Sequence, residues 1–224
     1  MDIESFNQCL AYVQATASTD SSLGAWLGIA GTLGGTGFGW WLNHRTTSKK
    51  EERTALLKKD CCLGEIKSLL GDCDHSSHQV QLLIKELGVK QRPKAHRLPS
   101  NVKLMLLENI YPEVASLFSQ QQQDWIRWIF RTVDNINKGL AAVADMRSEK
   151  SLFSLSKVLV NLQADLYDAS RLGLYVINDE KIELPALESM LTQIGVAPPC
   201  LLAHRALILN IQRNDELLGL DKEI

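Results

Sequence analysis

The chain has 224 residues, a formal net charge of −2 and 45% hydrophobic residues. This composition is typical of a folded protein and excludes a disordered segment or a basic protein that coats nucleic acid. We therefore expect no direct binding of nucleic acid.

The first 22 residues contain no Lys or Arg and are expected to form a short extracytoplasmic segment. Within it, residues 2–14 repeat apolar side chains at helical spacing. This pattern predicts an amphipathic helix that lies against the outer leaflet of a membrane.

Residues 23–42 form a run of 20 without one ionisable side chain. As a helix with a rise of about 1.5 Å per residue, the run spans roughly 30 Å, the thickness of a bilayer's hydrocarbon core. Trp26, Trp40 and Trp41 lie near its ends, where aromatic side chains meet the membrane surface. The run thus predicts one transmembrane helix, with the lipid bilayer as partner. A cleaved signal peptide would need a basic start and a small-residue cleavage site; the other alternative, a buried glycine-rich helix, is rarely uncharged over this length.

Positive charge flanks this run on one side only. No Lys or Arg precedes it, and six follow within a short distance: Arg45, Lys49, Lys50, Arg53, Lys58 and Lys59. Basic residues stay on the cytosolic side of a membrane. We therefore expect a single-pass protein of the bacterial inner (plasma) membrane, with the N-terminus outside and residues 43–224 in the cytosol.

Seven of the 20 residues in the run are glycine. At about 100° per residue, five of them fall within an arc of roughly 80°. This glycine face consists of Gly24, Gly28, Gly31, Gly35 and Gly39. Glycines four residues apart allow helices to approach closely in lipid, so the face predicts a homo-oligomer. The alternative is a lone span, because glycine is common in membrane helices.

Residues 43–88 are expected to form a juxtamembrane helical stalk or coiled coil. Two rows of positions alternate in steps of three and four over four heptads, which favours a helix packed against other helices. The rows are Leu56, Leu63, Leu70, Ser77 and Ile84, and Lys59, Ile66, Cys73, Val80 and Leu87. Clustered Gly, Asp and Ser predict a break at residues 71–78, and Gly88 is expected to cap the helix.

Residues 89–100 form a basic loop that contains Lys90, Arg92, Lys94 and Arg97. These side chains are candidates for contact with anionic lipid or with a small anionic ligand. The alternative is a solvated charged loop, since no glycine-rich phosphate cradle accompanies the charges.

The remaining residues, 101–224, are expected to form a cytosolic α-helical bundle, which makes the fold class all-α. Apolar residues at helical spacing along 123–146 and 149–177 are interpreted as core, and 174–184 as a helix end followed by a turn. Helices are expected at about 101–109, 112–122, 123–146, 149–177, 185–194 and 199–218, the second opening at Pro112.

No motif for catalysis, for a cofactor or for a metal is found. Cys73, His75 and His78, with a Cys pair upstream, match no structural zinc spacing. Asp165 and Asp168 lie one helical turn apart, which is more typical of a solvated face than of a catalytic pair. We therefore expect no catalytic or metal site, no cofactor and no enzymatic activity.

In layout, the chain resembles small bacterial defence effectors that combine an N-terminal span with a cytosolic sensor. The resemblance is architectural and involves no shared motif. It implies a membrane effector of pore type, in which the cytosolic domain senses a ligand or protein partner and alters the packing of the spans. The alternative is a membrane-tethered scaffold or adaptor that recruits a cytosolic partner without forming a pore.

Overall fold

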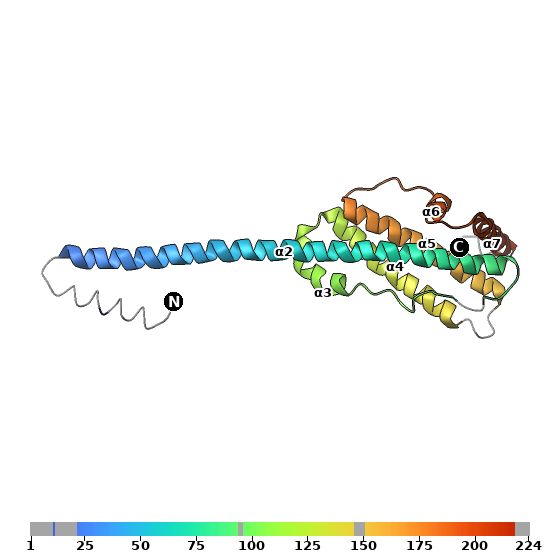
Figure 1. Ribbon diagram of the computed structural model, residues 1–224, viewed down its shortest axis with the longest axis horizontal. Helices are drawn as coiled ribbons and strands as arrows, with labels where there is room; N and C mark the ends of the chain where they lie inside the picture. The colour runs from blue at the N-terminus through green and yellow to red at the C-terminus, as the bar shows by residue number, and fades with distance from the viewer. Residues whose placement is uncertain (1–10, 12–21, 94–95, 146–150, 218–224) are drawn as a thin grey trace. The chain divides into compact units, whose positions relative to one another are not determined.

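The computed structural model describes residues 11, 22–93, 96–145 and 151–217. This part of the chain contains α-helices and one short 3₁₀ helix and no strand (Figure 1). The all-α fold class is therefore confirmed. The amphipathic helix expected over residues 2–14 lies, apart from residue 11, outside the described residues.

The helices follow one another along the chain, with the longest connection, residues 89–104, between α2 and α3. They are α2 (Ser22–Gly88), α3 (Met105–Val114), the 3₁₀ helix η1 (Ala115–Leu117), α4 (Gln120–Ala144), α5 (Leu152–Asn178), α6 (Leu187–Gln193) and α7 (Pro198–Leu217).

The chain divides into two compact units, Met1–Ala55 and Leu56–Ile224, and α2 contributes residues to both. Across the described ranges, no helix combines the length and the apolar character that crossing a bilayer requires. The span over residues 23–42 thus stays a prediction.

Helix α2 runs without interruption through residues 71–78, so the predicted break is wrong. Ser76 and Ser77 are buried, and Cys73 and Val80 lie in the core. Burial of these side chains against other helices outweighs the weak helix propensity of Gly, Asp and Ser.

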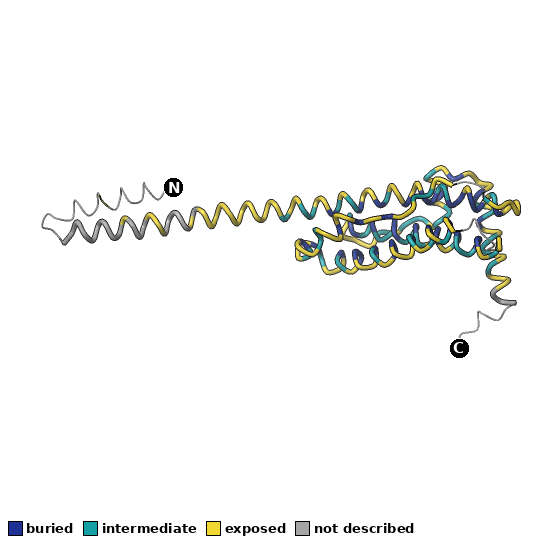
Figure 2. Tube along the Cα trace, turned by 90° about the horizontal axis from the view of Figure 1, so that it is seen from below, coloured by how far each residue is buried: buried dark blue, intermediate teal, exposed yellow. Residues whose placement is uncertain are grey.

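The heptad rows of α2 supply core side chains to the second unit. Ile66, Cys73, Val80 and Leu87 are all buried, as are Ser77 and Ile84 of the other row. Figure 2 shows buried stretches, in dark blue, on the helices of this unit. The prediction that this stretch packs against other helices is confirmed from about residue 62 onward.

Helices α4 and α5 supply most of the remaining core, and α3, α6 and α7 add buried residues such as Leu107, Leu191 and Cys200. The predicted stripe on α4 is buried, with Trp125, Ile129, Val133, Ile136, Leu140 and Val143. The stripe predicted on α5 is buried at Leu155, Leu159, Leu162 and Leu166, whereas its first member, Leu152, is exposed. Helix α5 approaches α2 closely at Gly173, where an added Cβ would lie 2.8 Å from Cδ2 of Leu70.

The helices predicted between 101 and 122 begin and end differently in the structure. Residues 101–104 are not helical, and Pro112 lies inside α3 instead of opening a helix. Glu65 of α2 accepts hydrogen bonds from the backbone N–H groups of Leu106 and Leu107, at 3.0 and 2.5 Å. It thereby satisfies donors at the start of α3, which no local side chain caps.

The break after α3 falls at Ser119, which caps α4. Its hydroxyl accepts from the Gln122 N–H at 3.1 Å, and the Gln122 side chain accepts from the Ser119 N–H at 3.0 Å. Such a reciprocal pair is a capping box. At the same end of the helical pair, α5 stops at Asn178, and Asp179 takes a left-handed conformation with φ of 53° and accepts a hydrogen bond from the Ser119 hydroxyl. The predicted helix end and turn is confirmed.

Candidate functional site

The glycine face is described at two positions. Gly31 and Gly35 are exposed, and a Cβ added to either would meet no atom within 4 Å. The backbone of α2 is therefore uncovered at these positions. Gly24, Gly28 and Gly39 belong to the same helix, and their surroundings lie outside the described residues.

The basic loop is exposed at Lys90, Arg92 and Arg97, whereas Lys94 lies outside the described residues. Lys90 follows the end of α2 and has a φ of 60°. None of the three lines either of the two pockets described below.

A pocket lies between α4 and α5, which run antiparallel. Their register follows from two contacts. The rings of Trp125 and Tyr175 are 5.4 Å apart, and Gly139 faces Leu162 further along the pair. Because helical rise is constant, this register sets Thr132 beside Asp168.

This α4–α5 pocket has a volume of about 570 Å³, within the range typical of small-molecule sites. It is lined by Trp125, Trp128, Arg131, Thr132, Asn135, Asp165, Asp168, Arg171, Leu172, Tyr175 and Lys181.

Aromatic rings form much of one wall. Trp125 is buried, whereas Trp128 leaves 55% of its surface exposed. The Arg131 guanidinium lies 5.1 Å from the centre of the Trp128 ring, a cation–π distance. An exposed indole and an adjacent guanidinium thus lie together at the pocket.

Charged groups of both signs line the other wall. Nη2 of Arg171 pairs with Oδ1 of Asp168 at 2.8 Å, while Nε of Arg171 is buried and has no hydrogen-bond acceptor. Burial, and then the neighbouring Asp168, raise the pKa of the Asp165 carboxyl. Within the described part of the chain, Lys181 makes no ion pair.

From the sequence, Asp165 and Asp168 are interpreted as more typical of a solvated face than of a catalytic pair, and the Asp168 side chain is 46% exposed. Both are half-buried and line the α4–α5 pocket. The sequence signal for this arrangement was Arg171, three residues after Asp168, because residues at this spacing meet on a helix. The spacing of these residues along α5 does not reveal which face of α4 lies opposite them.

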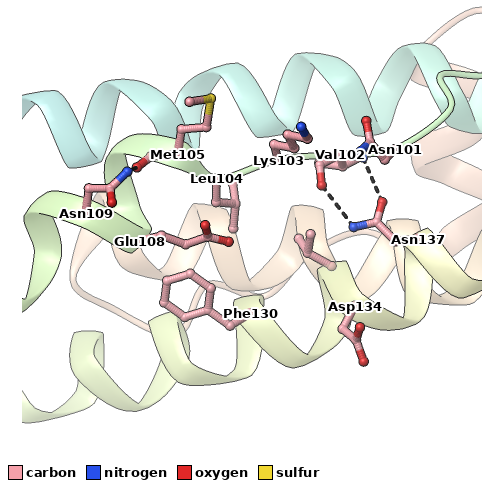
Figure 3. A pocket seen from close by; sticks show the side chains of 11 residues that line it. Asn101, Val102, Lys103, Leu104, Met105, Glu108, Asn109, Phe130, Asp134 and Asn137 are labelled. Atoms are coloured by element: carbon pink, nitrogen blue, oxygen red, sulfur yellow. Dashed lines mark hydrogen bonds between the residues drawn. The ribbon is translucent and has the colours of Figure 1, made fainter.

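A second pocket, of about 520 Å³, lies between residues 101–109 and α4 (Figure 3). Its polar groups at Asn137 and Asp134 are engaged within the protein. The Asn137 amide donates to the Val102 carbonyl at 2.9 Å and accepts from the Val102 N–H at 2.7 Å, while Asp134 pairs with Lys138 at 2.6 Å. The Asn137 hydrogen bonds therefore hold the extended segment around Val102 to α4. In the α4–α5 pocket, polar groups such as Lys181 have no such partner within the described residues and are available for a ligand.

A buried polar network joins α2, α5 and α7. Nε2 of Gln81 donates to Oε1 of Gln163 at 3.1 Å and to Nδ1 of His204 at 3.3 Å, and Nε2 of Gln163 donates to Ser77 at 3.1 Å. Burial lowers the pKa of His204, although Glu188 opposes the shift. Sequence reasoning missed this network, since its members are distant along the chain.

The residues weighed as metal ligands are dispersed. Cys73 is buried, and burial raises the pKa of its thiol to about 12. His75 is exposed and His78 is half-buried. Over the ranges that the structure covers, no three His, Cys, Asp or Glu side chains are grouped to hold a metal ion.

Comparison of the chain with protein-family models, with curated proteins and with solved structures found no match. The fold and site define an all-α helical bundle with a polar and aromatic pocket between two antiparallel core helices.

Proposed function

We propose that the chain is a single-pass inner-membrane protein that self-associates through its glycine face. Its cytosolic bundle senses a ligand or partner and changes how the spans pack, as a membrane effector of pore type. The observation that carries the proposal is the uncharged run over residues 23–42 with Lys and Arg on its C-terminal side only.

The composition of the run supports association of several spans. Seven glycines and three tryptophans keep its hydropathy low, so one isolated span would be held weakly. The exposed backbone at Gly31 and Gly35 supplies a surface where van der Waals packing between spans can add stability.

Helix α2 supports a link between sensing and span packing. The helix that contains the run also carries the core residues Ile66 and Ile84. Because protein cores are close-packed and rearrange between discrete states, a change in the bundle acts on the same helix that carries the glycine face.

A pair of double variants tests the proposal. Replacing Gly31 and Gly35 by Leu should raise hydrophobicity and retain insertion, yet reduce crosslinked oligomer and abolish depolarisation of expressing cells. The matched variant, Leu at Gly34 and Gly37, lies off the glycine face and should be milder. Equal effects of the two pairs would contradict a specific face.

Topology is tested separately with reporters. A fusion after Ile224 should behave as cytosolic and a fusion before Asp2 as external, because six basic residues follow the run. Periplasmic activity of the C-terminal fusion would overturn the orientation.

The second candidate function is a tethered scaffold. Leu202 and Leu209, two helical turns apart on α7, are 64% and 65% exposed, and they offer an apolar strip to a cytosolic protein. A scaffold needs only to stay in the membrane. Unchanged cell potential in the wild type, and full activity with Leu at Gly31 and Gly35, would favour this alternative.

A further inference from the structure

The α4–α5 pocket contains a donor that the protein itself does not satisfy. Nε of Arg171 is buried without an acceptor, although the same guanidinium pairs with Asp168 through Nη2. A buried N–H without a partner is unfavourable. Nε itself is shielded, but the Arg171 side chain is 42% exposed, so the rest of its guanidinium can donate to an acceptor group in the pocket.

The pocket also offers a flat apolar surface. Trp128 is more than half exposed on α4, with Arg131 against its ring. Large exposed aromatic side chains are typical of binding surfaces, because an incoming ring can stack on them. The surface at Trp128 is suited to a planar aromatic group.

The charges are distributed along the pocket. Lys181 follows α5 and lines the pocket together with Tyr175, which is in contact with Trp125. The helix register places Asn135 and Asp165 at the opposite end. A ligand that fits has an anionic group toward Arg131, which precedes Asn135 by one helical turn, and a hydrogen-bonding edge toward Lys181 at the other end of the pocket. Asp168 does not oppose the anion strongly because Arg171 neutralises it.

We propose that the α4–α5 pocket binds a planar aromatic anion of the nucleotide class, with its ring on Trp128 and its phosphate near Arg131. This assignment deepens the proposed function, on which it rests for its biological meaning, since it names the class of ligand that the bundle senses. The pocket volume of about 570 Å³ accommodates a molecule of this size.

The test is calorimetric titration of the full chain in detergent with nucleoside monophosphates (AMP, GMP, CMP and UMP) as probes. Adenosine and inorganic phosphate are titrated separately to distinguish ring from anion. We expect saturable binding of at least one nucleotide, about tenfold or more tighter than either component, because stacking and charge-assisted hydrogen bonds each contribute that factor.

Variants then place the binding in the pocket. Trp128→Ala and Arg131→Gln should each weaken binding about tenfold, whereas Trp128→Phe should restore most of the affinity lost in Trp128→Ala. The matched control is Arg127→Gln, because Arg127 lies on the same helix, pairs with Asp124 at 3.2 Å and does not line the pocket. It should bind within about twofold of wild type.

Three outcomes would overturn the assignment. First, none of the four nucleotides binds. Second, inorganic phosphate binds as tightly as the nucleotides do. Third, Arg127→Gln and Arg131→Gln weaken nucleotide binding equally while both variants keep the helical circular dichroism of the wild type. The membrane proposal fails independently. If nucleotides bind but cells are not depolarised, the effector role is contradicted and the ligand assignment stands. If cells are depolarised but no nucleotide binds, the ligand assignment is contradicted and the effector role stands.

Discussion

At the scale of single residues, the end of α2 is unusual because a lysine occupies the left-handed position. The Lys90 N–H donates to the Leu87 carbonyl at 2.8 Å and the Gln91 N–H to the Glu86 carbonyl at 3.0 Å, the pattern of a Schellman motif. The predicted cap, Gly88, is the last helical residue instead. Its missing side chain makes room for Ala203, whose Cβ would lie 2.9 Å from an added Cβ.

Replacing Lys90 by Gly should therefore stabilise the bundle by about 1 kcal/mol, because glycine adopts a positive φ without steric cost. Chemical unfolding followed by circular dichroism would measure the change. Asp179→Gly removes the same strain at the end of α5 but also loses the acceptor for the Ser119 hydroxyl. Its gain should be smaller, and an equal or larger gain would contradict this explanation.

The buried His204 makes stability depend on pH. Burial lowers its folded-state pKa below the usual 6.5, so the unfolded chain takes up the proton first. The stability contributed by neutral His204 is complete above about pH 6.5 and is lost as the pH falls through the folded-state pKa. Protonation at Nδ1 would also remove the acceptor for Gln81.

We accordingly expect the free energy of unfolding to fall between about pH 7.5 and about pH 5, and this fall to be shallower in His204→Gln. Unfolding curves at several pH values would show it. The exposed His75 provides the control, since His75→Gln should keep the wild-type slope. A wild-type slope in His204→Gln would exclude the histidine as the cause.

At the scale of elements, α2 shows that glycines in one helix serve different purposes. A Cβ at Gly71 would meet nothing within 4 Å, whereas one at Gly88 would overlap Ala203, whose Cα is also within 3.7 Å. The first position is open, and the second is a close approach between α2 and α7.

The same substitution should thus have opposite effects along α2. Gly71→Ala should stabilise the bundle by up to about 1 kcal/mol through helix propensity. Gly88→Ala should destabilise it by about 1–3 kcal/mol, because the backbone of α7 must shift. Thermal unfolding of the two variants beside wild type measures both, and stabilisation by Gly88→Ala would disprove the close approach.

At the scale of the whole molecule, the second unit, Leu56–Ile224, contains its own core. Ile66, Leu69 and Ile84 of α2 are almost completely inaccessible to solvent. They contribute to the core as fully as residues of α4 and α5 do, so the unit needs this part of α2.

Residues 56–224 expressed alone should therefore be strongly helical and unfold cooperatively. Residues 89–224, which lack α2, should be aggregated or unfolded, because the inner faces of α4 and α5 lose their apolar partners. Circular dichroism and size-exclusion chromatography distinguish the two fragments. A sheet-dominated spectrum of 56–224, or a folded 89–224, would contradict this view of the core.

The sequence by itself determined the all-α class and most core positions. Apolar periodicity is a local property of the sequence. It therefore predicted the buried rows of α2 from Ile66 to Leu87 and the buried stripe of α4 from Trp125 to Val143. Local signals were less reliable at helix ends. Pro112 did not open a helix, and the polar stretch 71–78 did not break one.

Only the tertiary structure decided which helix faces meet. The cap that Glu65 provides for α3 and the network around Gln81 and His204 join residues distant in sequence, and the α4–α5 pocket brings Trp128 and Arg171 into one lining. Periodicity identifies the apolar face of each helix but not its partner or register. Those depend on the long-range packing of ridges and grooves, which no local window of sequence contains.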